Sequence, residues 1–549
     1  MRGARDIFSR VLLLVLVCGV LCCGASGTGG ARDEAERGVG APRARSLAGY
    51  GGPRQTSNDR DPIGPGSFYP PSASTLKAAV QAMLGDALAP RPDRPIAIVV
   101  PHAGYVFSGQ IAADAYRQAS AHRYDTVVIV GVNHTDGTFS KVGICPGRAF
   151  RTPLGSVPID DALVAALEKA DSDCVLDANV HKAEHSVEVQ VPFVQHLFPN
   201  AKIVPLVVGR PDPSMCTRLG RALAEVAKDR SVLLVASSDL SHYPASRDAG
   251  DVDRRTLEII AGLDADAVYR NEVADSGRAV PQLVTHACGT GAIMAVITAA
   301  RALGATRGTV LSYANSGDTI AGEPDRAVGY GAVVFTAGIP GSDVAALKAP
   351  PPDDGPLQAQ DKKWMLGFAR ETIRRYLTTA TLPLPRGFSP RLQRNRGVFV
   401  TLKKRGELRG CIGHIPSDMP MVRLAGMMAF ESALNDPRFA RLALEEMREV
   451  EIEISILSPP KAVSGPSDIV VGRDGVVIAA DGRSAVFLPQ VAPEQGWNRD
   501  QMLDNLCVKA GLPAKRWQQR GTRFETFQAE VFGEGRGQGT GDQGPGTKD

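Results

Sequence analysis

The stretch PIAIVVPHAGYVFSGQIAADAYRQAS (95–120) joins a short β-branched run to a helical pattern. The run 95–101 is almost continuously apolar, which is typical of a strand buried on both faces of a sheet. Residues 108–120 carry apolar side chains at helical spacing, so they predict a helix packed on that sheet. The stretch therefore predicts a layered α/β domain with His102 where the strand ends.

The same alternation continues along the first half of the chain. Apolar runs that predict strands occupy 125–131, 202–209, 232–237, 309–314 and 328–336, and helical patterns occupy 160–170 and 217–229. The segment 185–198 stays open, because its apolar residues alternate while Pro192 argues against a helix interior. We expect one α/β layered domain over residues 58–338.

A Pro/Gly-rich segment, residues 339–356, predicts a linker to a second periodic region. Turn signals at Asp474-Gly475 and Asp481-Gly482 indicate a meander there. The order of patterns predicts a second, α+β domain over 357–533 and a disordered tail over 534–549. Its expected helices cover 361–377, 419–435 and 498–510, and its expected strands cover 397–402, 451–457 and 468–471.

Composition narrows the class of protein. A chain of 549 residues is too long for one core, and 43% hydrophobic with 22% charged residues is typical of a globular protein. The formal net charge is only +3 and aromatic residues make up 5%, so the chain lacks the basic, aromatic-rich surface of nucleic-acid binders. We expect no nucleic-acid partner.

The N-terminus resembles a secretory signal. Arg2, Arg5 and Arg10 precede an apolar run over 11–23 that closes in small residues. This run is too short for a spanning helix, so no transmembrane domain is expected beyond a leader over 1–26, which a disordered segment over 27–57 would follow. The protein is then exported or membrane-associated. The alternative is a start of translation further along and a cytoplasmic protein.

Histidines gather at strand ends in the first half. His102, His134 and His242 each follow a predicted strand, and ligands of open α/β sheets bind at the carboxyl ends of strands. Each alone is more simply a hydrogen-bonded structural residue, whereas three at the same kind of position indicate a site. Glu184-His185 and Asp239 belong to the same neighbourhood, where a carboxylate can orient an imidazole or act as a base.

Cysteine spacing shows no CxxC pair among the six cysteines that follow the leader, which argues against a zinc ribbon. Cys288 differs from the rest because it precedes a clear helical pattern, and a helix N-terminus favours the thiolate that binds metal or attacks an electrophile. The alternative is a buried cysteine that behaves as a small apolar side chain.

Six motifs in order resemble the Memo family over about residues 58–338: PHAGYVFSG, VGVNHT, EHSVEVQVPF, SSDLSHY, THACGTG and SGD (316–318). The resemblance implies a fold like that of class III extradiol dioxygenases of the LigB type. It also implies a metal site of two histidines and one cysteine, which places the ligands at His102, His134 and Cys288. His185, Asp239 and His242 match positions that line the same pocket, where they would act as catalytic residues.

The ligand set that the resemblance implies bears on the metal. Extradiol dioxygenases hold Fe(II) with two histidines and a carboxylate, whereas a thiolate is softer and suits copper or iron. We therefore expect one mononuclear Fe(II) or Cu site, with Zn as a further option, and the thiolate argues against ring-cleaving activity.

The second half resembles the AMMECR family over about 357–533, through ELRGCIG (407–413), ESALNDPRF (431–439) and SAVFLPQVAPEQGW (484–497). Cys411 is either a functional thiol beside Arg409 or a buried structural cysteine between two glycines. Together with a radical SAM protein, the two halves resemble the AmmeMemoRadiSam set, which implies a radical SAM protein as partner.

Three functions remain open. The first is a metal-dependent oxidoreductase, dioxygenase-like in fold, that acts on an unknown small-molecule substrate. The second is a non-catalytic metal-binding or carrier module with a protein-docking domain. The third is a metal-free cysteine hydrolase with Cys288 as nucleophile.

Overall fold

The computed structural model describes residues 59–274, 280–318, 322, 324–347, 353–415 and 419–535. The expected leader, the expected disordered segment 27–57, residues 348–352 of the expected linker and most of the expected tail lie outside these ranges. Among the described residues, contacts group Pro460 to Ala529 as one compact unit, and residues 59–459 with those from Glu530 as another. Over the described ranges, no helix is both long and apolar enough to cross a membrane.

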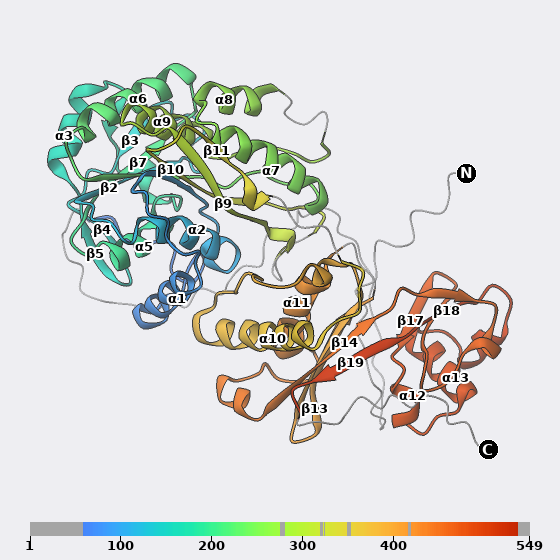
Figure 1. The fold of residues 1–549 in the computed structure, drawn as a ribbon. Coiled ribbons are helices and arrows are strands. Elements are labelled where there is room, and N and C mark those ends of the chain that lie inside the picture. The colour runs from blue at the N-terminus through green and yellow to red at the C-terminus, as the bar shows by residue number, and fades with distance from the viewer. Residues whose placement is uncertain are drawn as a thin grey trace, which may run out of the picture. The chain divides into compact units, whose positions relative to one another are not determined.

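A mixed nine-stranded sheet forms the centre of the first half (Figure 1). Its strand order is β11-β9-β10-β1-β8-β2-β7-β3-β6. The strands β1, β8, β2 and β7 run parallel, whereas β10 pairs antiparallel with both β1 and β9. The predicted strands are confirmed as β1 (Pro95–Val100), β2 (Thr126–Val132), β7 (Lys202–Val208), β8 (Val232–Ser237), β9 (Arg307–Asn315) and β10 (Gly329–Thr336).

Shorter strands complete the sheet. They are β3 (Val142–Ile144), β6 (Cys174–Leu176) and β11 (Gly341–Asp343), and a separate hairpin joins β4 (Ala149–Thr152) to β5 (Gly155–Pro158). Strands this short carry too little periodicity to be found from the sequence. β11 lies inside the predicted linker and pairs in parallel with β9, so the first part of that linker extends the sheet.

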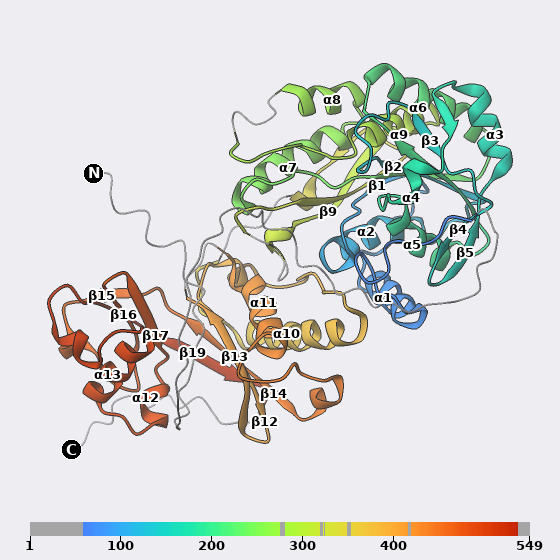
Figure 2. The same ribbon diagram turned by 180° about the vertical axis from the view of Figure 1, so that it is seen from behind.

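Helices cover both faces of the sheet (Figures 1 and 2). α2 packs on β1, β9 and β10, whereas α9 packs on β8, β1 and β2. α6 begins after Asp212, whose side chain accepts a hydrogen bond from Met215 N, with Pro213 in the first turn. The helices here are α1 (Ala73–Gly85), α2 (Tyr105–Ala119), α3 (Asp161–Ala170), α4 (Asn179–Lys182), η1 (Glu188–Gln190), α5 (Val191–Leu197), α6 (Pro213–Ala227), α7 (Ser246–Ala261), α8 (Ala265–Ala274), α9 (Thr290–Ala302), η2 (Ser316–Asp318) and η3 (Ala345–Leu347).

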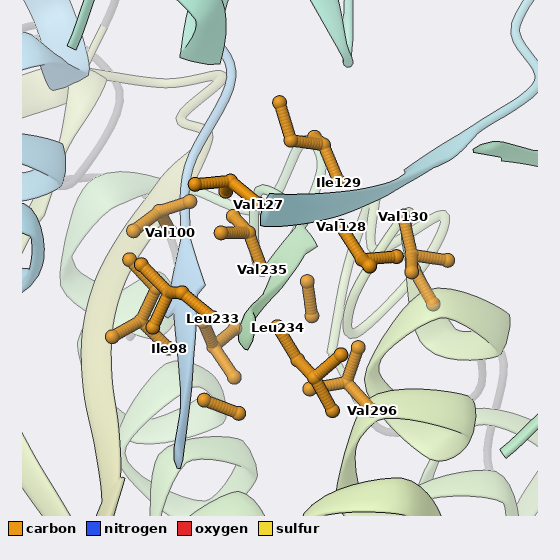
Figure 3. Packing of buried hydrophobic residues seen from close by; sticks show 14 of the residues in the cluster. Ile98, Val100, Val127, Val128, Ile129, Val130, Leu233, Leu234, Val235 and Val296 are labelled. Atoms are coloured by element: carbon orange, nitrogen blue, oxygen red, sulfur yellow. The ribbon is translucent and has the colours of Figure 1, made fainter. Parts of the chain in front are cut away.

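The core of this half lies on the parallel strands (Figure 3). Ile98 of β1 and Ile129 of β2 are fully buried on one face of the sheet, whereas Leu234 of β8 is buried on the other face, beside Val296 of α9. This packing fixes the strands, because a close-packed interior leaves side chains little freedom to shift. The carboxyl ends of β1, β2 and β8 therefore form a rigid edge from which loops can present side chains.

A second sheet, in the order β13-β12-β14-β19, follows in the same unit. The helices α10 (Ala359–Thr379) and α11 (Met421–Leu434) pack on it, with η4 (Pro390–Gln393) and η5 (Leu444–Arg448) in its connections. Glu534 accepts hydrogen bonds from Arg370 and from Ile452 N. The first residue of the predicted tail is therefore bound to α10 and to the second sheet. The strands are β12 (Val398–Lys404), β13 (Glu407–His414), β14 (Val450–Leu457) and β19 (Ala529–Gly533).

The unit Pro460–Ala529 contains its own sheet, β15-β18-β16-β17. The hairpin predicted at Asp481-Gly482 joins β16 to β17, and both residues have positive φ (52° and 73°). The strand predicted at 468–471 is wrong: Asp474 accepts a hydrogen bond from Val470 N and turns the chain there. Its elements are β15 (Lys461–Val463), η6 (Pro466–Asp468), β16 (Gly475–Ala480), β17 (Arg483–Phe487), α12 (Val491–Glu494), α13 (Arg499–Lys509), η7 (Ala514–Gln518) and β18 (Arg523–Phe527).

The predicted fold class is confirmed: an α/β layered first half is followed by an α+β second half. The first sheet is mixed rather than wholly parallel, because β9 and β10 add an antiparallel pair at one side.

Candidate metal centre

Three histidines meet beside the carboxyl ends of the parallel strands. His102 follows β1, His134 follows β2, and His185 lies between α4 and η1. Each of the three offers one ring nitrogen, and these nitrogens all lie within 4.8 Å of one another. Imidazole nitrogens at such separations can bind one ion together, so this three-histidine group could hold a metal.

The His102 ring is oriented by a buried hydrogen-bond network. Its Nδ1 lies 3.2 Å from Ser237 Oγ, which donates its own proton to Ser186 O at 2.6 Å and also accepts from Gln190 Nε2. Because the hydroxyl has one proton and that proton is committed, His102 Nδ1 must be the donor. The lone pair of His102 is therefore on Nε2, which faces Cys288 Sγ at 3.2 Å.

Glu184 orients His134 in a similar way. Its carboxylate accepts from His134 N at 2.7 Å, from His134 Nδ1 at 3.0 Å and from Ser186 N at 2.7 Å. Burial raises the pKa of Glu184, but these hydrogen bonds outweigh burial and lower it to about 2. The ionised carboxylate holds the proton on Nδ1 of His134, which leaves Nε2 free as a ligand atom.

His185 is held by ring stacking. Its ring lies 4.1 Å from the Phe68 ring and 4.8 Å from the His134 ring, centroid to centroid, and both pairs are nearly parallel. The segment that carries Phe68 is anchored by a buried cluster in which Arg60 and Tyr69 bind the carboxylate of Glu188. No sequence pattern predicts the contact between Arg60 and Glu188, because the two residues are 128 positions apart.

Burial keeps two of these imidazoles neutral. Burial lowers the pKa of His102 to about 3 and that of His185 to about 4. For His134, burial also acts to lower the pKa, but the hydrogen bond with Glu184 outweighs it and raises the pKa above its ordinary value. Neutral imidazole is the form that binds metal, so His102 and His185 offer lone pairs at neutral pH.

Cys288 lies beside the group, two residues before α9 begins at Thr290. Its Sγ lies 3.2 Å from His102 Nε2 and 3.7 Å from Asp239 O. Burial raises the pKa of the Cys288 thiol well above its ordinary value, and the charge of Asp239 adds to this effect. Burial thus opposes the thiolate that the position before α9 was expected to favour.

Asp239 supports His102 through the backbone. Its Oδ1 accepts from His102 N at 2.7 Å and from Ala103 N at 3.2 Å, and its Oδ2 lies 3.9 Å from His102 Nε2. Burial raises the pKa of this carboxyl. Asp239 thus fixes the loop after β1 with one oxygen and turns the other toward the ligand atom of His102.

His242 connects two loops of the site. Its backbone N donates to Thr285 O at 3.1 Å, and its backbone O accepts from Val284 N at 2.6 Å. Its ring Nε2 is buried and has no hydrogen-bond partner among the described residues. Burial lowers the pKa of His242, so the ring is a neutral base beside the site. The three predicted ligands and the three predicted pocket residues thus all lie in one region.

Cys411 has structural contacts. Burial raises the pKa of its thiol, Thr401 Oγ1 donates to its Sγ, and its backbone N donates to Asp436 Oδ2 at 2.9 Å. A Cβ at Gly410 would come within 2.1 Å of Ser432 O, so this glycine allows α11 to approach β13. Between the two interpretations of Cys411, this environment favours the structural one.

The comparisons with known proteins follow this division of the chain. The Memo-like protein family matches residues 60–334 and the AMMECR1 family matches residues 366–532. A MEMO1 family protein of Methanopyrus kandleri is 36% identical over 292 residues, which is 51% of this chain and all of the relative. One from Caldivirga maquilingensis is 35% identical over 287 residues, which is 50% of this chain and 98% of the relative.

Among solved structures, the uncharacterized protein PH0010 from Pyrococcus horikoshii is 37% identical. The match covers 32% of this chain and 93% of that one, with a TM-score of 0.31.

Proposed function

The chain belongs to the Memo-like protein family and carries an AMMECR1 domain, and from this we propose that its first half binds one metal ion at His102 and His134. The third ligand is His185 or the Cys288 thiolate. The observation that carries the proposal is the distance of 4.8 Å or less between the ring nitrogens of the three histidines.

The chemistry of the donors fits a transition metal. His102 and His185 have lowered pKa values and are neutral, and Ser237 directs the lone pair of His102 to Nε2. Glu184 holds a proton on Nδ1 of His134, so Nε2 is the nitrogen with which that ring would bind a metal. Imidazole suits iron, copper and zinc, whereas a thiolate adds a preference for softer ions. We propose Fe(II) or Cu as the native ion, with Zn as the alternative.

We further propose that the site is that of an oxidoreductase acting on a small molecule. A bound iron or copper ion would supply the redox step. His242 is placed to take a proton from a substrate, since its buried Nε2 is free among the described residues and its pKa is lowered. Asp239 presents a second carboxylate oxygen, Oδ2, toward the same region.

The two alternatives use the same residues differently. A carrier would bind the ion without turnover, and the AMMECR1 domain would serve as a docking surface. A metal-free cysteine hydrolase needs a thiolate paired with an imidazolium. Burial favours neutral forms of both Cys288 and His102, which disfavours the hydrolase.

We also propose a partner and a compartment for this protein. The presence of both families in one chain supports a shared task, for which we propose a radical SAM protein as partner. The arginines and apolar run at the start of the sequence support export.

Metal content of anaerobically purified protein tests the site. We expect about one ion per chain for the unchanged protein, from the one group of ligands found among the described residues, and loss of the ion in His102→Ala. Comparing His185→Ala with Cys288→Ser identifies the third ligand, since loss in only one of them assigns it. Cys411→Ser is the matched control, and equal loss in that variant would contradict the site.

A second experiment separates the enzyme from the carrier. Metal-loaded protein is incubated with oxygen and candidate reductants, and electron transfer is followed by oxygen consumption. Turnover that is lost in His242→Gln, with metal content kept, supports the oxidoreductase. A protein that keeps its ion and consumes no oxygen with any of the reductants supports the carrier.

A further inference from the structure

Glu272, near the end of α8, binds the segment that carries Cys288. Its Oε2 accepts hydrogen bonds from His286 N at 2.9 Å and from Ala287 N at 3.2 Å. Its Oε1 accepts from Thr285 Oγ1 at 2.7 Å. One carboxylate thus holds three consecutive residues immediately before Cys288.

The same segment is held from its other side. Thr285 O accepts from His242 N at 3.1 Å, and Gly289 N donates to Ser238 Oγ at 2.9 Å. A Cβ at Gly289 would come within 2.7 Å of Ser237 O, so the backbone approaches β8 very closely there. With the backbone fixed on both sides, the position of the Cys288 side chain is determined by these contacts.

We propose that Glu272 is a positioning residue that sets the Cys288 thiol against the metal centre. The proposal rests on the proposed function in one respect, namely that Cys288 contributes to metal binding. In this proposal Glu272 does not bind the ion: it acts through its hydrogen bonds to Thr285 Oγ1, His286 N and Ala287 N. No sequence motif of the site includes it, because α8 lies outside all of them.

The chemistry of the contact explains why a carboxylate is needed. An ionised carboxylate only accepts hydrogen bonds, and Thr285 Oγ1, His286 N and Ala287 N each donate one to Glu272. In Glu272→Gln, the neutral amide loses the charge-assisted hydrogen bonds to the two backbone N–H groups, and its NH₂ group can no longer accept the proton of the Thr285 hydroxyl. The segment is then held more weakly and can shift.

Zn²⁺ affinity, measured by competition with a chelator, tests the inference. We expect Glu272→Gln to weaken binding by about 10- to 100-fold, the usual effect of removing a group that orients a ligand. Asp266→Asn is the matched control, because it removes one exposed carboxylate from the same helix. The double variant Glu272→Gln/Cys288→Ser should bind no more weakly than Cys288→Ser alone.

Equal losses from Glu272→Gln in both backgrounds would overturn the proposal, since Glu272 would then act on the fold in general. A second measurement needs no metal: the rate at which iodoacetamide alkylates Cys288, followed by mass spectrometry. We expect the rate to rise several-fold in Glu272→Gln and to stay unchanged in Asp266→Asn. An unchanged rate in Glu272→Gln would also overturn the proposal.

The two measurements distinguish this inference from the proposed function. If Cys288→Ser binds Zn²⁺ as tightly as the unchanged protein, the thiolate is not a ligand and the role of Cys288 in the proposed function fails. The alkylation rate then decides alone whether Glu272 positions the thiol.

Discussion

Replacement of Glu184 by glutamine should separate metal affinity from fold stability. The carboxylate is 1% exposed and accepts from the backbone N of both His134 and Ser186 as well as from His134 Nδ1. Glutamine keeps one acceptor oxygen but turns an NH₂ group toward the other donors. One buried backbone N–H would then lack an acceptor, which costs about 1–3 kcal/mol of unfolding free energy.

The effect on metal binding has a different origin. A neutral amide oxygen accepts from His134 Nδ1 more weakly than the carboxylate does, so the ring is held less firmly with Nε2 toward the other histidines. Loss of such an orienting group weakens metal affinity by about 10- to 100-fold, which is about 1.4–2.7 kcal/mol. Both effects should therefore occur together and be of similar size.

Two assays measure the two effects. Urea unfolding of the metal-free protein gives the change in stability, and chelator competition with Zn²⁺ gives the change in affinity. Glu225→Gln removes an exposed carboxylate from α6 and should change neither. A Glu184→Gln variant that loses stability but binds Zn²⁺ as before would refute the orienting role.

Three further changes test other parts of the structure. Glu188→Ala should cost about 3–5 kcal/mol of unfolding free energy in urea, because it leaves the buried Arg60 guanidinium unpaired. Gly413→Ala should destabilise the protein by about 1–3 kcal/mol, since a Cβ there would lie 2.1 Å from the Phe399 ring. Gly465→Ala, with open space and an extended backbone (φ 179°), is the control for the added methyl alone. The hydrogen bond with Arg409 helps to lower the pKa of Glu446 from its ordinary value of 4.5 to about 2. The bond should therefore stabilise the fold fully above pH 4.5, and this stabilisation should be lost as pH falls toward 2. Thermal unfolding between pH 5 and 2 should show a weaker pH dependence in Glu446→Gln, and an unchanged dependence would contradict this assignment.

Local patterns were enough to predict most of the first sheet. A strand such as β8 is a run of buried apolar residues, and the side chain that follows such a strand lies at the sheet edge whatever the rest of the chain does. His102, His134 and Asp239 could be found for this reason. The short strands β3 and β6 could not, because three residues define no period.

Contacts between distant residues determine what the sequence did not predict. The sequence places His185 in the pocket but not among the expected ligands. It lies beside the other two histidines with Phe68 stacked on its ring, and the segment of Phe68 is anchored by an ion pair between distant residues. Burial opposes the expected ionisation of Cys288 for a related reason. A helix N-terminus can be recognised in a sequence, but the burial that opposes it depends on which segments cover the thiol.

The carboxylates of the site explain how its geometry can exist before any ion binds. Glu184 fixes the loop after β2, Asp239 fixes the loop after β1, and Glu272 fixes the segment before α9, each by accepting backbone N–H groups. None of these bonds uses a lone pair on a histidine ring. Metal binding therefore does not have to break the contacts that orient the ligands, and little of its free energy is spent on ordering the loops.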